Sequence, residues 1–471
     1  MFSRPVLALM IVLGVATTAG RARAEEDEDD EARSPADAAL PAPITPPTPP
    51  EMRDVVPITP APATPRMPEK AEDEEPEIDY TTPRYEPAGF PLIAGDSDIG
   101  LQLGAAGTLT RFRNGVRPFY WNMDAVVGIS VKSGPKGWEI AQQFFRWQWD
   151  VPGLWDGKWR TNPYVSYART INAGYFGVGN DSDGAPPVGS SGDTTKFFQW
   201  ENKELRLRVI NRFALGKSVD FVVAPVLQYV APTAYAGSRL DLDAKQPNNI
   251  NGSPSVRGLQ ELALATASVG FLYDSRDNEF FPQNGGYHQA ALKYIQGFPV
   301  DSEVRYGAAS AVFAAYKSVG PFVLAGRLLV DFLFGHVPFY ELISGGPFIS
   351  VDMLGGSNGV RGVPQGRYNG RAKAVANVEI RSMFARFKLL GFPFKMGANT
   401  FFDTGRVWAE YRFNAPRDGT GLGLKWGAGG GIYLQWGDAA IFRIEAAYSP
   451  DAAAVSPGFP VGVYVSDQVM F

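Results

Sequence analysis

Alternation with a period of two residues, repeated in segment after segment from about residue 87 to residue 471, constrains the fold more than any other feature of this sequence. In one segment, Leu324 and Phe332 fall on one parity, whereas Arg327 and Asp331 fall on the other. Such alternation is typical of strands with one apolar and one polar face. Because the segments run to ten or more residues between turn-forming residues, we predict an all-β, antiparallel transmembrane β-barrel with its apolar face toward lipid.

The segments and their connections give a strand count. A bacterial barrel whose ends lie on the same side of the membrane needs an even number of strands, so the short first segment with Pro87 and Pro91 is included. The long connections, near 174–196, 232–260, 336–372 and 405–419, then fall on one side. The sixteen expected strands are 87–95, 98–111, 118–131, 137–149, 159–173, 197–212, 218–231, 261–274, 286–296, 302–317, 320–335, 373–386, 393–404, 420–434, 439–449 and 461–471.

The first 24 residues have the layout of a secretory signal peptide. Arg4 provides the positive start, residues 6–15 form an uncharged apolar core, and Ala22 and Ala24 provide the small residues of a cleavage site. The core is shorter than the ~20 residues of a spanning helix, so a membrane anchor is the less favoured alternative. Export combined with a barrel pattern predicts the outer membrane of a Gram-negative bacterium.

Residues 25–86 are rich in acidic residues and proline. The segment begins with seven consecutive acids, Glu25 to Glu31, and contains 18 acidic against 5 basic residues. Large apolar side chains are scarce, so it cannot bury enough surface to offset the entropy of ordering. We expect a disordered periplasmic tail at 25–86, followed by the barrel domain at 87–471.

The composition argues against catalysis and against bound metals or cofactors. The chain has no Cys and two His, His288 and His336, which excludes disulfides, thiol nucleophiles and Cys-ligated metals. No nucleophile motif accompanies the histidines. The glycine-rich run 421–431 alternates with leucine and tryptophan, so a strand explains it better than a phosphate loop does. We expect no enzyme, no cofactor, no metal site and no nucleic-acid partner.

The chain ends on an aromatic residue. Phe471, with the apolar Val469 two positions earlier, resembles the C-terminal signal by which barrels are recognised for insertion. Asp467 shares the parity of Val465 and Val469, so it would face lipid and departs from the pattern.

Three short motifs in the second half of the chain carry a more specific likeness. Together, and in this order, they resemble the motifs of the BamA/TamA family of outer-membrane proteins, also described as bacterial surface antigen barrels. A fourth, weaker likeness lies at 175–181. The three are a turn motif with Asp274, Arg276, Asp277 and Asn278, a loop motif with Val360, Arg361 and Gly362, and a strand motif with Phe401, Asp403 and Gly405.

The alternation places acidic side chains inside the predicted barrel near the loop motif. Glu379 and Asp403 fall on the inward parity of neighbouring strands. The resemblance implies that the long sixth loop folds back into the lumen, where Arg361 pairs with Asp403, lies near Glu379 and packs on Phe401. Arginine suits such a role because its planar fork binds carboxylates with two hydrogen bonds and stacks on rings. We expect this contact to hold the loop in place rather than to be an active site.

The resemblance also implies a function: assembly or translocation of proteins at the outer membrane, through a weak seam between the first and last strands. Family members of this kind carry POTRA domains before the barrel, whereas this chain offers the acidic tail. The implied partners are the lipid bilayer, client proteins and an unidentified periplasmic protein. The alternative is a passive pore or structural barrel without insertase activity.

Overall fold

The computed structural model describes residues 82–471, apart from 97, 99, 114–118, 135–136, 184–195, 246–248, 251–252, 255, 280, 301–302, 390–391, 413–414, 437–439, 454–459 and 467–469. The expected signal peptide, the acidic tail up to residue 81, Asp467 and Val469 therefore lie outside the described residues. No helix in the described part is both long and apolar enough to cross a membrane.

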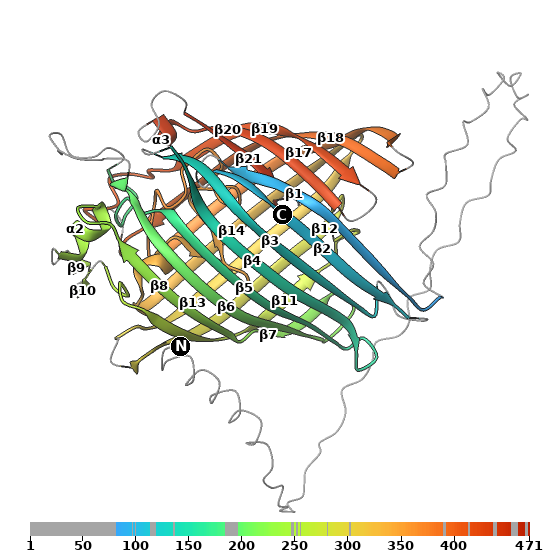
Figure 1. Cartoon of the computed structure of the whole chain (residues 1–471), viewed down its shortest axis with the longest axis horizontal. Helices are drawn as coiled ribbons and strands as arrows, with labels where there is room; N and C mark the ends of the chain where they lie inside the picture. Colours follow the sequence, from blue (N-terminus) through green and yellow to red (C-terminus); the bar gives the residue numbers. More distant parts are fainter. Residues whose placement is uncertain are drawn as a thin grey trace, which may run out of the picture. The chain divides into compact units, whose positions relative to one another are not determined.

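One antiparallel sheet of seventeen strands contains most of the described residues (Figure 1). Strands that follow one another in the sequence pair with one another, and β1 also pairs with β21, which closes the sheet into a barrel. The first half comprises β1 (Arg84–Asp96), β2 (Gly100–Phe112), β3 (Trp121–Gly134), β4 (Gly137–Leu154), β5 (Trp159–Gly174), β6 (Gln199–Ala214), β7 (Val219–Val223) and β8 (Val226–Ala234). The second half comprises β11 (Leu262–Asp274), β12 (Gly285–Phe298), β13 (Arg305–Val319), β14 (Phe322–His336), β17 (Ala372–Leu389), β18 (Phe392–Trp408), β19 (Lys425–Trp436), β20 (Ala440–Tyr448) and β21 (Val461–Ser466). The predicted all-β, antiparallel fold is confirmed.

The strand count differs from the expected sixteen at one place. Residues 218–231 were expected to form one strand, but the structure divides this region into β7 and β8, which both pair with β6 and β11. Pro225 lies between them and has no N–H to donate to the ladder, so pairing is interrupted there. β1 also begins at Arg84, three residues inside the region assigned to the tail, because Arg84 pairs with Phe112 at the end of β2.

Side chains along the strands alternate between the outside and the bore. In β14, Leu324, Leu328 and Phe332 are exposed on the outer face, whereas Arg327 and Asp331 are buried within the barrel. An arginine on the lipid face at mid-membrane would cost about 2–4 kcal/mol, which explains why the polar parity points inward. The barrel thus presents an apolar outside and a charged bore.

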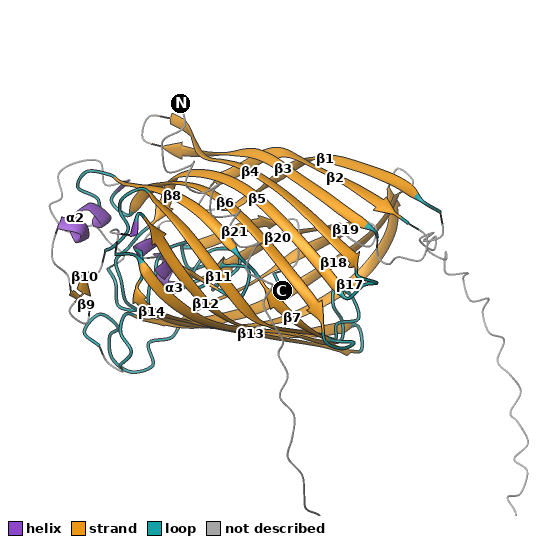
Figure 2. Cartoon of the chain, turned by 90° about the horizontal axis from the view of Figure 1, so that it is seen from below, coloured by secondary structure: helices purple, strands orange, loops and turns teal. Residues whose placement is uncertain are grey.

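The long connections gather at one end of the barrel, which we call the loop end, and short turns lie at the other (Figure 2). The loop end also carries short elements: α2 (Arg239–Lys245), β9 (Asn249–Ile250), β10 (Ser253–Pro254) and α3 (Pro450–Ala453). Loop 6, residues 337–371, contains η3 (Phe339–Leu342), β15 (Ser344–Gly345) and β16 (Val351–Asp352). Its Met353, Leu354, Val360 and Val363 are buried and pack against strand residues such as Val375. Loop 6 therefore lies inside the barrel.

Candidate functional site

Close approach of loop 6 to the barrel wall depends on glycine. Gly362 adopts φ +92°, and a Cβ there would lie 2.9 Å from the backbone of Tyr448. On the wall, a Cβ at Gly427 would lie only 1.8 Å from the carbonyl oxygen of Arg361. Gly405 also has a loop neighbour, because its Cβ would meet Leu354 at 3.2 Å. Small residues on both sides thus allow the backbone of loop 6 to lie against β18 and β19.

Arg361 is fully buried and makes three hydrogen bonds to Asp403 on β18. Its Nε donates to Oδ2 at 2.7 Å, its Nη2 donates to Oδ1 at 3.0 Å, and its backbone N–H donates to Oδ2 at 3.1 Å. The two guanidinium bonds are the bidentate arrangement that arginine forms with carboxylates. The structure therefore brings together the two residues that the resemblance pairs.

Two further carboxylates complete the surroundings of the same guanidinium. Nη1 of Arg361 forms an ion pair with Glu379 Oε1 on β17 at 2.7 Å and donates to Glu445 Oε1 on β20 at 2.9 Å. Glu379 was expected nearby, but Glu445 was not among the candidate residues. The sequence contained one signal for Glu445: it shares the inward parity of Arg443, which places its side chain in the bore.

Phe401 covers the face of the same guanidinium. The carbon Cζ of Arg361 lies 3.4 Å from the centroid of the Phe401 ring, which is itself buried. A cation over an aromatic face gains roughly 0.5–2 kcal/mol, with the larger values at desolvated sites. The guanidinium of Arg361 is thus held by hydrogen bonds in its own plane and by the Phe401 ring on one of its faces.

Additional arginines balance the three carboxylates. Arg381 Nε lies 2.7 Å from Glu379 Oε2, and Arg443 Nη1 lies 3.4 Å from Glu445 Oε2. Burial by itself would lower the pKa of Arg361, but Glu379, Asp403 and Glu445 raise it well above its usual value. The cluster of Arg361, Arg381, Arg443, Glu379, Asp403 and Glu445 is hereafter the arginine network.

Loop 6 also contacts both sides of the β1–β21 seam. The seam consists of two residue pairs within the described residues, Gly95 with Val465 and Asp96 with Tyr464, whereas β1 and β2 share thirteen. The Gly362 N–H donates to the Tyr464 hydroxyl at 2.8 Å, and the Gln365 N–H donates to Asp98 Oδ2 at 3.0 Å. The shortest pairing in the barrel is therefore bridged by the loop that Arg361 holds.

The turn motif forms a separate, self-contained structure between β11 and β12. Arg276 donates to both oxygens of Asp274, at 2.9 and 2.8 Å, and packs over Tyr287. Asp277 accepts the backbone N–H groups of residues 283 and 284 at 2.9 and 3.0 Å, and Asn278 Oδ1 accepts that of residue 281 at 2.9 Å. These contacts shape a turn at the end of the barrel opposite loop 6.

Phe471 lies in the bore instead of following the outward parity of Val465. Its carbonyl oxygen accepts a bond from Arg381 Nη2 at 3.0 Å, and the Cζ atoms of Arg327 and Arg381 lie 5.0 and 4.9 Å from its ring centroid. β21 ends at Ser466, so Phe471 is not part of the ladder. Parity along a strand could not place it.

Comparison with solved structures finds similarity to outer-membrane proteins at low sequence identity. Among solved structures, BamA from Haemophilus ducreyi lacking POTRA domains 1–3 is 14% identical with TM-score 0.48, and the alignment covers 82% of this chain and 70% of that one. CdiB from Escherichia coli is 16% identical with TM-score 0.47, and CdiB from Acinetobacter baumannii is 11% identical with TM-score 0.43. Both cover 82% of this chain, which spans 62% and 60% of those proteins.

No curated protein matches the sequence significantly. The Omp85 superfamily domain matches residues 194–453, more than half of the chain. This region includes Arg361 and its three carboxylate partners, and the match confirms the resemblance at the level of the superfamily. The chain belongs to the Omp85 superfamily.

Proposed function

We propose that this protein is an integral outer-membrane barrel of a Gram-negative bacterium that takes part in assembling or translocating other proteins. The observation that carries the proposal is the arginine network, which holds loop 6 inside the bore beside a two-pair seam. In this proposal the loop end faces outward, the turn end faces the periplasm, and no step is enzymatic.

The seam is the place where the barrel opens with the least loss of backbone hydrogen bonding. Among the residues that the structure describes, two pairs join β1 to β21 and six join β20 to β21. Because Gly362 bonds to Tyr464 and Gln365 bonds to Asp98, a movement of loop 6 changes the contacts on both sides of the seam. This coupling supports a role in which loop 6 and the seam act together on a client protein.

The proposal includes the expected signal peptide at 1–24 and a periplasmic tail that begins at residue 25. The partners are the lipid bilayer, client outer-membrane or secreted proteins, and a periplasmic protein that delivers them.

The test is deletion of the gene followed by quantitative profiling of outer-membrane and secreted proteins. Loss of specific barrels or secreted proteins, restored by the intact protein but not by the Arg361→Ala variant, is the expected result. Unchanged levels of all other outer-membrane and secreted proteins would contradict an assembly or translocation role.

A passive pore is the second candidate because the bore is not filled. Two adjoining cavities of about 410 and 350 Å³ lie in the bore, the first between loop 6 and strands β4 to β6 and the second beside strands β1 to β5 and β21. A pore conducts steadily in a planar bilayer, whereas a barrel blocked by loop 6 conducts poorly until Arg361→Ala releases the loop. Equal, steady conductance of the parent and the variant would favour the pore.

A further inference from the structure

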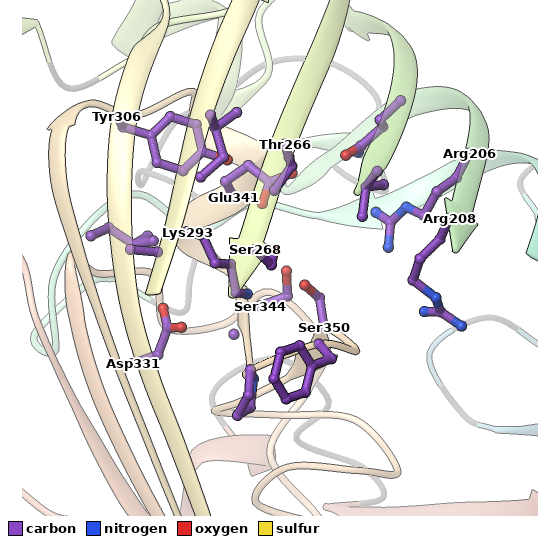
Figure 3. A pocket seen from close by; sticks show the side chains of 18 residues that line it. Arg206, Arg208, Thr266, Ser268, Lys293, Tyr306, Asp331, Glu341, Ser344 and Ser350 are labelled. Carbon is purple, nitrogen blue, oxygen red and sulfur yellow. The ribbon is translucent and has the colours of Figure 1, made fainter. Parts of the chain in front are cut away.

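The wall of the bore formed by β4, β5 and β6 presents arginines to the open cavities. Arg206 and Arg208 lie two residues apart on β6, and both line one pocket (Figure 3). Arg206 also lines a second cavity, and Arg146 on β4 lines a third, which shares Gln142 with the second. We call Arg146, Arg206 and Arg208 the basic wall.

Arg208 has no ion pair, a feature it shares with the buried arginines Arg327, Arg367 and Arg406. Those three donate hydrogen bonds to amide, hydroxyl or carbonyl oxygens, whereas Arg208 donates none to the described residues. Its side chain is 8% exposed, and its Nε has no hydrogen-bond partner. Its guanidinium packs over the ring of Tyr164 at 4.3 Å, and it forms no ion pair with any residue that the structure describes. A buried cation without a partner is unfavourable, so the site favours an anion from outside the chain.

Neighbouring carboxylates do not fill this role. The Arg206 Nε lies 2.8 Å from Glu204 Oε1, and the Asp331 carboxylate lies 3.1 Å from the Lys373 Nζ. Glu341 lines the same pocket but forms no ion pair with Arg208. None of these acids therefore pairs with Arg208, which remains without an anionic partner among the described residues.

The surrounding chemistry favours a carboxylate over a phosphate. The backbone N–H groups of this wall are used in the ladders that pair Arg208 with Tyr164 and Val226, so they cannot form the cradle that phosphates prefer. A single guanidinium can bind a carboxylate with two hydrogen bonds. The side-chain amide of Gln228, which lines the pocket of Arg208, and that of Gln142, which lines the adjoining cavity, can pair with both donors and acceptors of a polypeptide.

We propose that Arg208, supported by Arg206 and Gln228, binds the carboxylate side chains of an acidic polypeptide segment inside the bore. The pocket that Arg208 lines has a volume of about 50 Å³, room for a carboxylate group, and it shares Arg206 and Gln228 with the cavity of about 410 Å³. That cavity shares Gln142, Ala168 and Ser357 with the cavity of about 350 Å³, so the space continues along the wall and leaves room for an extended segment. The proposed function enters only in identifying the segment as part of a client protein.

The test is titration of the purified full-length protein in lipid nanodiscs with hexaglutamate, followed by calorimetry at low salt. We expect saturable binding that weakens at least tenfold in Arg208→Gln and less in Arg208→Lys, which keeps the charge. Arg169→Gln is the matched control: this arginine lies on β5 at the parity opposite to Tyr164, pairs with Glu201 and should leave binding unchanged.

Hexaglutamine should not bind, and added salt should weaken the binding of hexaglutamate because the attraction is electrostatic. Equal affinity of the parent and Arg208→Gln, or no binding to the parent, would overturn the inference. Inorganic phosphate that binds as tightly as hexaglutamate in an Arg208-dependent way would overturn the assignment to polypeptide. Since binding is measured without any client, this result is separate from that of the deletion experiment.

Discussion

Two sites in the same bore treat buried arginines differently: the arginine network pairs them with carboxylates, whereas Arg208 has no ion pair. On β17 to β20, each of Glu379, Asp403 and Glu445 has an arginine within 4 Å, and Arg361 of loop 6 contacts all three. On β4 to β6, Arg208 is buried without any such partner. A fully paired network fixes one arrangement of the chain, whereas an unpaired cation is available to a ligand. The difference separates a structural site from a candidate binding site.

The largest expected effect is that of Arg361→Ala on stability. Removal of one member of a buried ion pair leaves uncompensated charge and typically costs about 3–5 kcal/mol. Three carboxylates would lose their shared partner, so the free energy of unfolding should fall by that order in urea titrations followed by tryptophan fluorescence. Arg412→Ala, in an exposed side chain paired with Glu410, is the control and should cause no measurable change. Similar unfolding curves for both variants would show that the network does not stabilise the barrel.

A smaller loss is expected for Tyr464→Phe, which tests the link between the network and the seam. The substitution keeps the ring but removes the acceptor of the buried Gly362 N–H, and an unsatisfied buried donor costs about 1–3 kcal/mol. Unfolding should occur at lower urea concentration than in the parent. The comparison is Tyr229→Phe, because the Tyr229 hydroxyl is exposed and contacts Glu261. An equal shift in both variants would show that the hydrogen bond between Gly362 and Tyr464 does not stabilise the barrel.

Phe401→Leu should have a still smaller effect. It keeps an apolar side chain beneath Arg361 but removes the aromatic face, which is worth roughly 0.5–2 kcal/mol. In the Arg361→Ala background the same substitution should cost less, because the cation is already gone. A double-mutant cycle measures this coupling, and additive effects would exclude the cation–π contact as a contributor.

The smallest effect on stability is expected for Arg208→Gln. Arg208 has no anionic partner to lose, and the loss of its contact with the Tyr164 ring is offset by the removal of an unpaired buried charge. Its replacement should therefore change the unfolding free energy by less than about 0.5 kcal/mol or raise it slightly. Urea titration beside Arg361→Ala is the direct comparison of the two sites. A loss as large as that of Arg361→Ala would mean that Arg208 is structural and that the sites do not differ.

The sequence predicted the fold and part of the network for identifiable physical reasons. Alternation along β14 and β18 fixed which residues point inward, and the resemblance then paired Arg361 with Asp403 and Glu379. Glu445 had the right parity, but parity cannot tell which of the inward residues meet across a bore.

Other features depend on contacts that alternation does not encode. The bridge from loop 6 to Tyr464 and Asp98 joins residues about a hundred or more positions apart, and no local pattern marks it. Phe471 leaves the ladder after Ser466, so strand parity does not determine the side on which its ring lies. The lack of an anionic partner at Arg208 likewise can be recognised only from the folded structure, in which the residues of the neighbouring strands surround it.

The central claim is that loop 6 lies inside the barrel, held by Arg361, and cysteine labelling tests it most directly. The chain has no cysteine, so a single Val360→Cys variant gives no background. Val360 is fully buried, whereas Leu422 between β18 and β19 is 75% exposed and provides the reference position. A bulky water-soluble maleimide should label Leu422→Cys at least a hundredfold faster than Val360→Cys, and Arg361→Ala should abolish most of that difference. Equal labelling rates at the two positions in the otherwise intact protein would contradict the account.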